Sequence, residues 1–431
     1  MSVSEQVMNE TAGGEDSSFA LDVLNQLEAE VLSTVFARLA QLEHQTTARV
    51  LEAFTTHGVG EQHFYSVSGY AHDDLGRAVT DKVFAHALQA EAALVRPHFV
   101  SGTHAIATAL RGMVQAGQTI VSVTGAPYDT LEEVIGLRGE SSQSLKAWGV
   151  DFKTTSVFDE ESPELGVDLA RLDKAKIEQA DVIYIQRSRG YALRPALLIQ
   201  DIEAIIAYCR EINPNVPVFV DNCYGEFTEA NEPTSVGADL IAGSLIKNPG
   251  AGIVPTGGYL AGKARWVERC ADALTAPGIG AEGGYMFHLT PSILQGLFMA
   301  PHAVSQSLKG MALAAAVFEK SGYTTTPSYD AIRGDIIQVL LMHAPEEQVR
   351  FCQVLQANSP IDSHVMPVAA DIPGYADKVV MAGGTFVQGS TQELSADGPL
   401  REPYPVFLQG GLSYAHIKLV LARVLSSLKQ G

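Results

Sequence analysis

The sequence predicts an α/β protein, with a large domain built on a mostly parallel sheet covered by helices and a smaller C-terminal α/β domain. Short apolar segments alternate with helical segments between Ala92 and Gly262, and this alternation favours parallel strands joined by crossover helices. The long apolar stretch Ile293–Phe318 carries several polar residues and suits a helix that links the two domains. Beyond that stretch, strand and helix signals resume and continue to the C-terminus.

The N-terminal part of the chain precedes the first strand signal. Met1–Ser18 is polar and acidic, and we interpret it as a mobile tail. Leu21–Phe54 has apolar residues at helical spacing, which predicts one or two amphipathic helices. We therefore expect a tail and helical arm over residues 1–75, the large domain over residues 76–300 and the small domain over residues 301–431.

The remaining elements are apolar runs bounded by glycine, proline and other turn residues. Such runs predict strands at Gln118–Val123, Val150–Val157, Val182–Ile185, Val218–Val220, Ala238–Ser244, Ile336–Met342, Lys378–Ala382 and Pro405–Leu408. Helical spacing predicts helices at Val79–Leu88, Ile199–Ile212, Pro345–Asn358 and Tyr414–Leu428, and another that ends near Met113.

Composition and charge exclude several classes of partner. The 431 residues are 46% hydrophobic and 18% charged, which is ordinary for a soluble globular protein. The net charge of −20 argues against nucleic acid, since phosphate binding needs clustered lysine and arginine. No segment predicts a membrane span, and Met1–Asp16 does not resemble a signal peptide, so we expect a cytoplasmic protein. The four cysteines form no CxxC pair, which predicts reduced thiols and no metal site.

A candidate anion site lies where an apolar segment leads into the helix that ends near Met113. The turn between them is Ser101-Gly102-Thr103. Backbone N–H groups at the start of a helix bind anions, so we expect the backbone of Gly102 and Thr103 to hold a phosphate group. Serine and threonine are also common helix caps, and this remains an alternative role for the same turn.

A lysine and an aspartate follow two neighbouring strand signals. Lys247 lies in a loop of small and apolar residues with no acid beside it in the sequence, and burial there would lower its pKa. Its neutral amine could then attack a carbonyl group. Asp221 ends the apolar run Val218–Val220. This arrangement holds pyridoxal phosphate, in which the acid pairs with the ring nitrogen and the lysine carries the aldehyde. Ser244, just before Lys247, is expected to bind the same phosphate.

Four polar residues follow the strand predicted at Val182–Ile185, where open α/β sheets place their ligands. We expect Gln186 or Ser188 to contact an oxygen on the cofactor ring. Arg187 and Arg189 are candidates for a substrate carboxylate, or for an ion pair inside the protein. We favour the internal ion pair for at least one of them.

Together these motifs resemble the pyridoxal-phosphate enzymes of the aspartate-aminotransferase fold, known as fold type I, on the cystathionine-lyase side. Ser101–Ala105, Tyr128–Val134 and Gln409–Leu412 are similar to the methionine gamma-lyase-like or aluminium-resistance proteins. The similarity runs from about Ala20 to the C-terminus. It implies fold type I, pyridoxal 5'-phosphate as cofactor, and a homodimer or homotetramer with active sites between subunits.

The resemblance also implies roles for single residues. Tyr128 would stack on the pyridine ring, although a half-exposed loop tyrosine is the alternative. Tyr70 and Arg77 would reach the cofactor phosphate of the neighbouring subunit, although their spacing departs from the family's Tyr-x-Arg. The alternative for this pair is a helix cap with an exposed arginine. In the small domain, Arg401 would bind the substrate carboxylate, with Arg333 in reserve. Arg401 could instead pair with a surface acid.

The expected activity is that of a carbon–sulfur lyase acting on a cysteine-, cystathionine- or methionine-like substrate. Lys247 and Tyr128 are the expected catalytic residues, with Lys247 removing the α-proton as a general base. A thiol would then leave from the β or γ carbon. The alternatives are transamination, racemisation or γ-replacement on the same cofactor, or a stress protein that binds the cofactor without catalysis.

Overall fold

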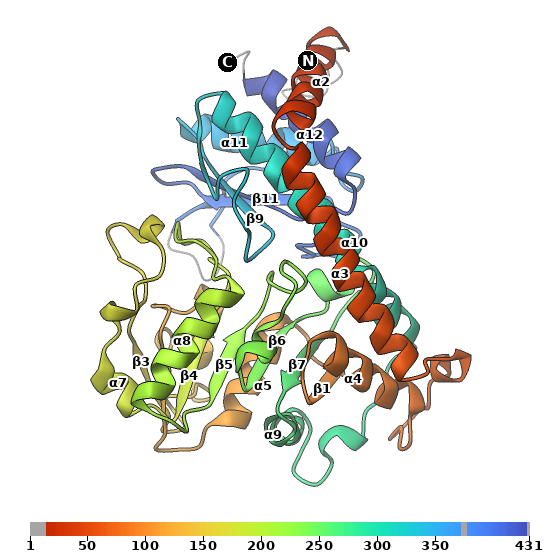
Figure 1. Ribbon diagram of the computed structural model, residues 1–431, viewed down its shortest axis with the longest axis vertical. Coiled ribbons are helices and arrows are strands. Elements are labelled where there is room, and N and C mark those ends of the chain that lie inside the picture. The colour runs from red at the N-terminus through yellow and green to blue at the C-terminus, as the bar shows by residue number, and fades with distance from the viewer. Residues whose placement is uncertain (1–13, 372–376, 429–431) are drawn as a thin grey trace. The chain divides into compact units, whose positions relative to one another are not determined.

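The computed structural model describes residues 14–371 and 377–428 (Figure 1). The chain forms two compact units. One contains the described residues up to His44 together with those from Pro301 onward, and the other is Gln45–Ala300. Each unit has its own sheet, and each is described here by itself.

The unit Gln45–Ala300 is built on a seven-stranded sheet in the order β1-β7-β6-β5-β4-β2-β3. The four pairings among β2, β3, β4, β5 and β6 are parallel. Strand β7 is antiparallel to both β6 and β1. The predicted mostly parallel sheet is therefore confirmed. The strands are β1 (Ala92–Arg96), β2 (Thr119–Ser122), β3 (Asp151–Thr154), β4 (Val182–Gln186), β5 (Val218–Asp221), β6 (Leu240–Ser244) and β7 (Gly258–Gly262).

Helices connect and cover these strands. Every residue of β4, β5 and β6 is buried, as expected for central strands covered on both faces. Helix α5 packs on β6 and against α9, and a Cβ added at Gly112 of α5 would lie 2.5 Å from Cys270 Sγ of α9. Glycine thus permits this close approach. The helices are α4 (Leu75–Ala87), α5 (Gly102–Met113), α6 (Asp129–Ile135), α7 (Lys174–Glu178), α8 (Ile199–Ile212) and α9 (Ala264–Leu274).

The other unit has a five-stranded antiparallel sheet in the order β10-β11-β12-β9-β8. Helix α2 (Gly14–Glu30) packs against α12 (Tyr414–Leu428), which also contacts α11 (Pro345–Ala357). Helices α3 (Ser33–Thr56) and α10 (Thr290–Lys320) run through the boundaries between the units, and α10 confirms the predicted long helix. The strands are β8 (Thr324–Thr326), β9 (Ile337–Leu341), β10 (Val379–Ala382), β11 (Ser395–Pro399) and β12 (Pro405–Gln409).

Two local expectations need correction or completion. The tail predicted to extend to Ser18 is wrong from Gly14 onward, because α2 starts there, and residues 1–13 lie outside the described residues. Polar residues can extend a helix whose later turns are packed. Strand β11 has the sequence Ser-Ala-Asp-Gly-Pro and gave no strand signal, yet it pairs with a strand on each side. Its extended form follows from these partners rather than from propensity.

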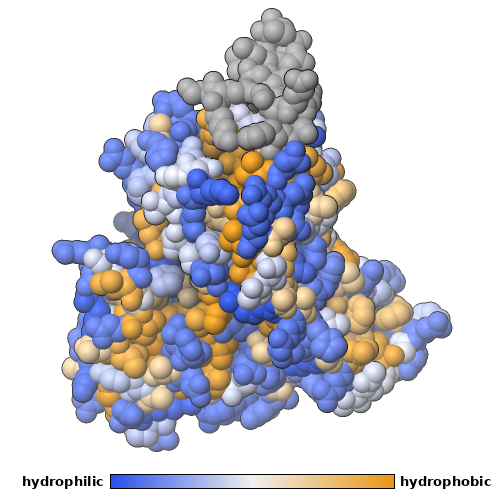
Figure 2. Space-filling model, turned by 45° about the horizontal axis from the view of Figure 1, so that its top comes forward, coloured by the Kyte–Doolittle hydropathy of each residue, from blue (hydrophilic) through white to orange (hydrophobic). Residues whose placement is uncertain are grey.

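The surface mixes hydrophilic and hydrophobic residues, as Figure 2 shows on the face it displays. Tyr65, Tyr70 and Val100 are among the exposed large apolar side chains of the Gln45–Ala300 unit. All four cysteines are buried free thiols. Within the two described segments, no helix has both the length and the apolar character that a bilayer span requires.

Candidate active site

The candidate active site lies where three parallel strands of the Gln45–Ala300 unit end. Gln186 is the last residue of β4, Asp221 the last of β5 and Ser244 the last of β6. Gln186 pairs in register with Asp221, which pairs in turn with Ala242. The parallel sheet thus brings together side chains that are far apart in the sequence, at the edge where such sheets bind ligands.

Lys247 is held against the turn that follows β5. It comes directly before the short 3-10 helix η5 (Asn248–Gly250), and its Nζ lies 3.9 Å from the centroid of the Tyr224 ring. Asn248 Nδ2 donates hydrogen bonds to the carbonyl oxygens of Tyr224 and Glu226, both at 3.0 Å. The Asn248 side chain therefore connects the loop that contains Lys247 to the turn after Asp221 through two hydrogen bonds.

The charge state of Lys247 differs from the sequence-based expectation. Burial acts to lower its pKa, but Cys223, Tyr224, Asp221 and Glu226 act in the opposite sense, and the net result is a raised pKa. No acid lies beside Lys247 in the sequence, yet the fold brings the carboxyl groups of Asp221 and Glu226 to it. The expectation of a lowered pKa is therefore wrong for the chain alone, in which the lysine is an ammonium group.

Asp221 is a buried acid with several donors around it. Burial raises the pKa of its carboxyl group, while Lys247 and the donors at Cys223 and Tyr184 act to lower it. Its Oδ1 accepts a hydrogen bond from the backbone N–H of Cys223 at 3.1 Å. These neighbours stabilise the charged form against the cost of burial.

The predicted anion turn lies against two residues of this site. A Cβ added at Gly102 would be 3.2 Å from Ser244 Cβ and 3.7 Å from Cys223 Sγ. The absence of a side chain at Gly102 therefore leaves a cradle at the start of α5, beside Ser244. Ser101 Oγ accepts a hydrogen bond from His104 N at 3.1 Å, so Ser101 does cap the helix, and Thr103 Oγ1 lies 2.9 Å from Thr130 Oγ1.

Tyr128 and Gln186 meet at a glycine. Gly190 has a φ of +56°, and a Cβ added there would be 3.2 Å from Tyr128 Cδ2 and 3.6 Å from Gln186 Nε2. Gln186 Nε2 donates to Ser188 O at 3.1 Å. Gln186 Oε1 is buried without a hydrogen-bond partner among residues 14–371 and 377–428. Such an atom favours a site that takes up a polar ligand.

Arg187 confirms the ion-pair interpretation. Its side chain is fully buried, and its Nη2 lies 2.9 Å from Glu229 Oε1. Its Nη1 donates to Asn222 Oδ1 at 2.8 Å and to Gly225 O at 2.9 Å. Arg187 therefore supports the turn after Asp221 from within the protein, and it is not a substrate ligand.

Arg77 is buried, so the alternative of an exposed arginine at a helix cap is wrong. Asp74 caps α4, and the Arg77 guanidinium donates to the carbonyl oxygens of Ala71, Glu282 and Gly284 at 2.7, 2.7 and 3.2 Å. Tyr70 is 83% exposed, with its ring 5.8 Å from that of His72. The role of Tyr70 and Arg77 toward a neighbouring subunit stays a prediction.

Arg401 and Arg333 belong to the unit that contains the antiparallel sheet. Arg401 is exposed, and its Nη1 lies 2.8 Å from Asp377 Oδ2, which is the kind of surface pair considered as its alternative. Arg333 is buried, and its Nη2 donates to Gln338 Oε1 at 2.7 Å. Of these two guanidinium groups, that of Arg401 is open to solvent. Its role toward a substrate carboxylate stays a prediction.

The sequence assigned no role to Tyr224, Glu226, Asn248 or Tyr259, which all contribute to the site. Tyr259 Oη donates to Glu226 Oε1 at 2.7 Å from strand β7, which runs antiparallel to β6. Only the strand register could have shown this contact. For Glu226, one available signal was an acid within the mostly uncharged run Asn222–Phe227 after Asp221.

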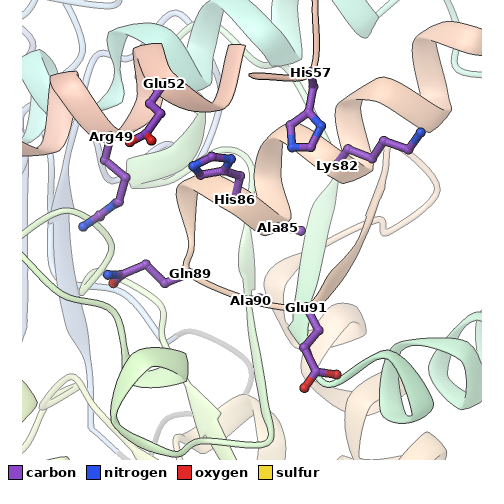
Figure 3. Close-up of a pocket in the computed structure, with 9 residues that line it drawn as sticks. All are labelled: Arg49, Glu52, His57, Lys82, Ala85, His86, Gln89, Ala90 and Glu91. Carbon is purple, nitrogen blue, oxygen red and sulfur yellow. The ribbon is translucent and has the colours of Figure 1, made fainter. Parts of the chain in front are cut away.

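A separate pocket of about 540 Å³ is lined by other residues (Figure 3). Two of them, His57 and His86, lie edge to face, with ring centroids 5.6 Å apart and an angle of 87° between the ring planes. Burial and the neighbouring His86 and Lys82 lower the pKa of His57. The two positive charges of Arg49 and Lys82 equal in number the two negative charges of Glu52 and Glu91. The lining therefore has no net charge that would select an ion. The complete lining is Arg49, Glu52, His57, Lys82, Ala85, His86, Gln89, Ala90 and Glu91.

The residues at the strand ends fit pyridoxal phosphate. Lys247 would supply the amine, and buried Asp221 would supply the acid for the ring nitrogen. The cradle at Gly102 beside Ser244 lies at the N-terminus of a 12-residue helix, a setting that suits a phosphate group. The unpartnered Oε1 of Gln186 adds a polar atom for the ring substituents.

Comparison with known proteins shows the family to which the chain belongs. The sequence profile of the methionine gamma-lyase family matches residues 20–429. The chain belongs to this family. An uncharacterized family relative, YnbB of Bacillus subtilis, is 45% identical over 406 residues, which are 94% of this chain and 95% of YnbB.

Solved structures of similar proteins include a carbon–sulfur lyase involved in aluminium resistance from Clostridium novyi. It is 41% identical, covers 99% of both chains and has a TM-score of 0.91. A proposed cystathionine β-lyase involved in aluminium resistance from Listeria monocytogenes is 44% identical, with a TM-score of 0.89 and coverage of 94% of this chain and 99% of that chain.

A more distant structure supports the fold alone. The pyridoxal-5'-phosphate-dependent protein YhfS from Escherichia coli is 15% identical and has a TM-score of 0.61, with coverage of 91% of this chain and 97% of that chain. The fold of this family member is therefore fold type I, as the sequence predicted.

Proposed function

We propose that this protein is a pyridoxal-phosphate-dependent carbon–sulfur lyase that acts on a sulfur amino acid of the cystathionine, methionine or cysteine type. One observation carries the proposal: the amine of Lys247 lies 3.9 Å from the centroid of the Tyr224 ring, on the turn that follows the buried Asp221, and the Asp221 carboxyl and the Lys247 amine influence each other's pKa. The names of the Clostridium and Listeria relatives support the choice of a lyase.

The residues that would hold the cofactor are Lys247, Asp221, Ser244 and the backbone at Gly102 and Thr103, with Tyr128 beside the ring. When bound, pyridoxal phosphate supplies an electron sink for negative charge at the α-carbon of an amino acid. Asp221 provides the charge that retains a proton on a ring nitrogen. Tyr128, packed against Gly190, contributes an aromatic face.

Lys247 is the residue placed to move protons. As a general base, its Nζ takes the α-proton of the substrate and can give it to the thiolate that leaves when the carbon–sulfur bond breaks. The amine must be neutral when it accepts this proton, whereas the surrounding acids favour its ammonium form. The reaction therefore requires control of the charge around Lys247.

A substrate screen tests the proposed function. The purified protein, loaded with pyridoxal phosphate, is incubated with cystathionine, methionine, homocysteine and cysteine, and both thiol and ketoacid are measured. We expect thiol and ketoacid in equal amounts, with pyruvate indicating β-elimination and 2-ketobutyrate indicating γ-elimination. A D-amino acid without ketoacid, or cofactor binding without turnover, would overturn the lyase assignment.

Replacing Arg401 with alanine tests the predicted substrate ligand. We expect KM to rise about 10- to 100-fold, because a charge-assisted hydrogen bond to the carboxylate is lost. The visible absorbance of the bound cofactor should not change. Arg171→Ala is a matched control, since Arg171 is also partly exposed and paired with an acid, Asp159. An unchanged KM in Arg401→Ala would exclude this role.

A further inference from the structure

A second buried acid acts electrostatically on Lys247, and the proposed reaction does not use it. Glu226 is fully buried. Its Oε1 accepts the hydrogen bond from Tyr259 Oη at 2.7 Å, and its Oε2 has no hydrogen-bond partner in the described part of the chain. A buried carboxylate oxygen without a donor is costly, whereas a carboxylic acid with its proton on that oxygen avoids the buried charge.

Three elements fix the position of this carboxyl group. Strand β6 leaves space for it at Gly243, where an added Cβ would be 2.5 Å from both Glu226 Oε1 and Tyr259 Cε1. Strand β7 contributes the Tyr259 hydroxyl. The residue after Lys247 holds its backbone, because Asn248 Nδ2 donates to Glu226 O at 3.0 Å. The side chain therefore has a defined place next to the lysine loop.

The groups that act on Glu226 differ from those around Asp221. Burial raises the pKa of Glu226 to about 8, and Glu232 acts in the same direction, while the Tyr259 hydroxyl, the backbone N–H of Glu226 and Lys247 act to lower it. Cys223 also interacts with Glu226, but its own pKa is raised well above the usual value, first by burial and then by Asp221. Asp221 accepts a hydrogen bond from the backbone N–H of Cys223 at 3.1 Å, and Glu226 accepts one from the Tyr259 hydroxyl at 2.7 Å. The negative charge of Glu232 in addition opposes the ionisation of Glu226.

We propose that Glu226 is a positioning residue for Lys247. Its carboxyl group keeps its proton and is neutral while the enzyme turns over, and it inhibits turnover once it ionises. In its neutral form the proton is on Oε2, and Asp221 is the principal carboxylate facing the Lys247 amine. On ionisation the O–H bond at Oε2 breaks and its proton passes to solvent. The second carboxylate then retains the proton on Lys247 Nζ, so that the amine no longer acts as a base.

This inference rests on the proposed function for its consequence in turnover but not for its spectroscopic test. The test uses the full-length protein loaded with pyridoxal phosphate and follows its visible absorbance between pH 6 and pH 10. We expect an absorbance step with a midpoint near pH 8 in the wild type, because a new charge that acts on Lys247 alters the bound cofactor.

Three variants make the assignment specific. Glu226→Gln should lose the step, since an amide of the same shape does not ionise. Tyr259→Phe should move the midpoint upward, by about one pH unit, because the carboxylate loses its hydroxyl donor. Tyr184→Phe is the control, as its hydroxyl lies at Asp221, and the midpoint should stay in place. A purely structural role for Glu226 would not produce this pattern.

Turnover provides a second measurement. The decline of kcat/KM on the alkaline side should lie near pH 8 in the wild type and move upward by at least one pH unit in Glu226→Gln. A step that persists at the same pH in Glu226→Gln, or that is absent from the wild type, overturns the inference. If the spectroscopic pattern appears but no sulfur amino acid is consumed, the proposed function fails while the role of Glu226 stands.

Discussion

Replacing Lys247 with alanine is expected to reduce turnover by about 10⁴-fold, the upper end of what a general base contributes, because the same side chain also carries the cofactor. The cofactor should then be removed by gel filtration under conditions that leave it attached to the wild type. Lys247 lowers the pKa of both Asp221 and Glu226, so its loss should also leave these two acids more protonated. Ketoacid release and visible absorbance measure the two main effects.

Lys263→Ala is the control for this experiment. Lys263 directly follows β7 in the same unit, and its Nζ lies 2.8 Å from Asp239 Oδ1. That variant should keep both cofactor and turnover. If Lys247→Ala retained a covalently attached cofactor, the amine at position 247 would not be its point of attachment, and the site proposed at the strand ends would be wrong.

Replacing Asp221 with asparagine is expected to lower kcat by about 10²- to 10³-fold with little change in KM. This is the range observed when a fixed electrostatic group is removed from an active site. The amide has the same shape but no charge, so it cannot retain a proton on the cofactor ring. The visible absorbance of the bound cofactor should therefore change as well. Steady-state kinetics and absorbance of the loaded variant check both effects.

Asp239→Asn provides a matched comparison for Asp221→Asn. Asp239 is also a buried acid, but it comes just before β6 and pairs with Arg210 at 2.8 Å. Its replacement should reduce the free energy of unfolding, since the partly exposed ion pairs of Asp239 with Arg210 and Lys263 are lost. The absorbance of the cofactor should stay unchanged. An Asp221→Asn enzyme with wild-type kcat would show that this acid is not the partner of the ring.

The sequence was sufficient to predict the residues at the ends of the parallel strands. Gln186, Asp221 and Ser244 each end an apolar run, and parallel strands necessarily present such ends at one edge of the sheet. The position of Gly102 at the start of a helix could be predicted for a similar reason, because the turn that contains it follows a strand signal. Such a helix start favours anion binding. The long helix α10 and the mostly parallel sheet followed from apolar length and periodicity.

Features that depend on strand register or on close packing could not be predicted. The hydroxyl of Tyr259 reaches Glu226 only because β7 runs antiparallel to β6, and the sequence did not indicate that direction. The pKa of Lys247 was predicted in the wrong direction for the same reason, since its acidic neighbours come from other elements. Arg77 has its acceptors at Glu282 and Gly284, far along the chain.

The turn after Asp221 has a consequence for the order in which the protein can assemble. Tyr224 and Phe227 have φ values of +70° and +62°, a left-handed backbone that is costly for such side chains. Arg187 and Asn248 hold this turn through hydrogen bonds to Gly225 and Glu226, from either side of it in the sequence. During synthesis, the catalytic geometry therefore cannot be complete until the ribosome has released Asn248.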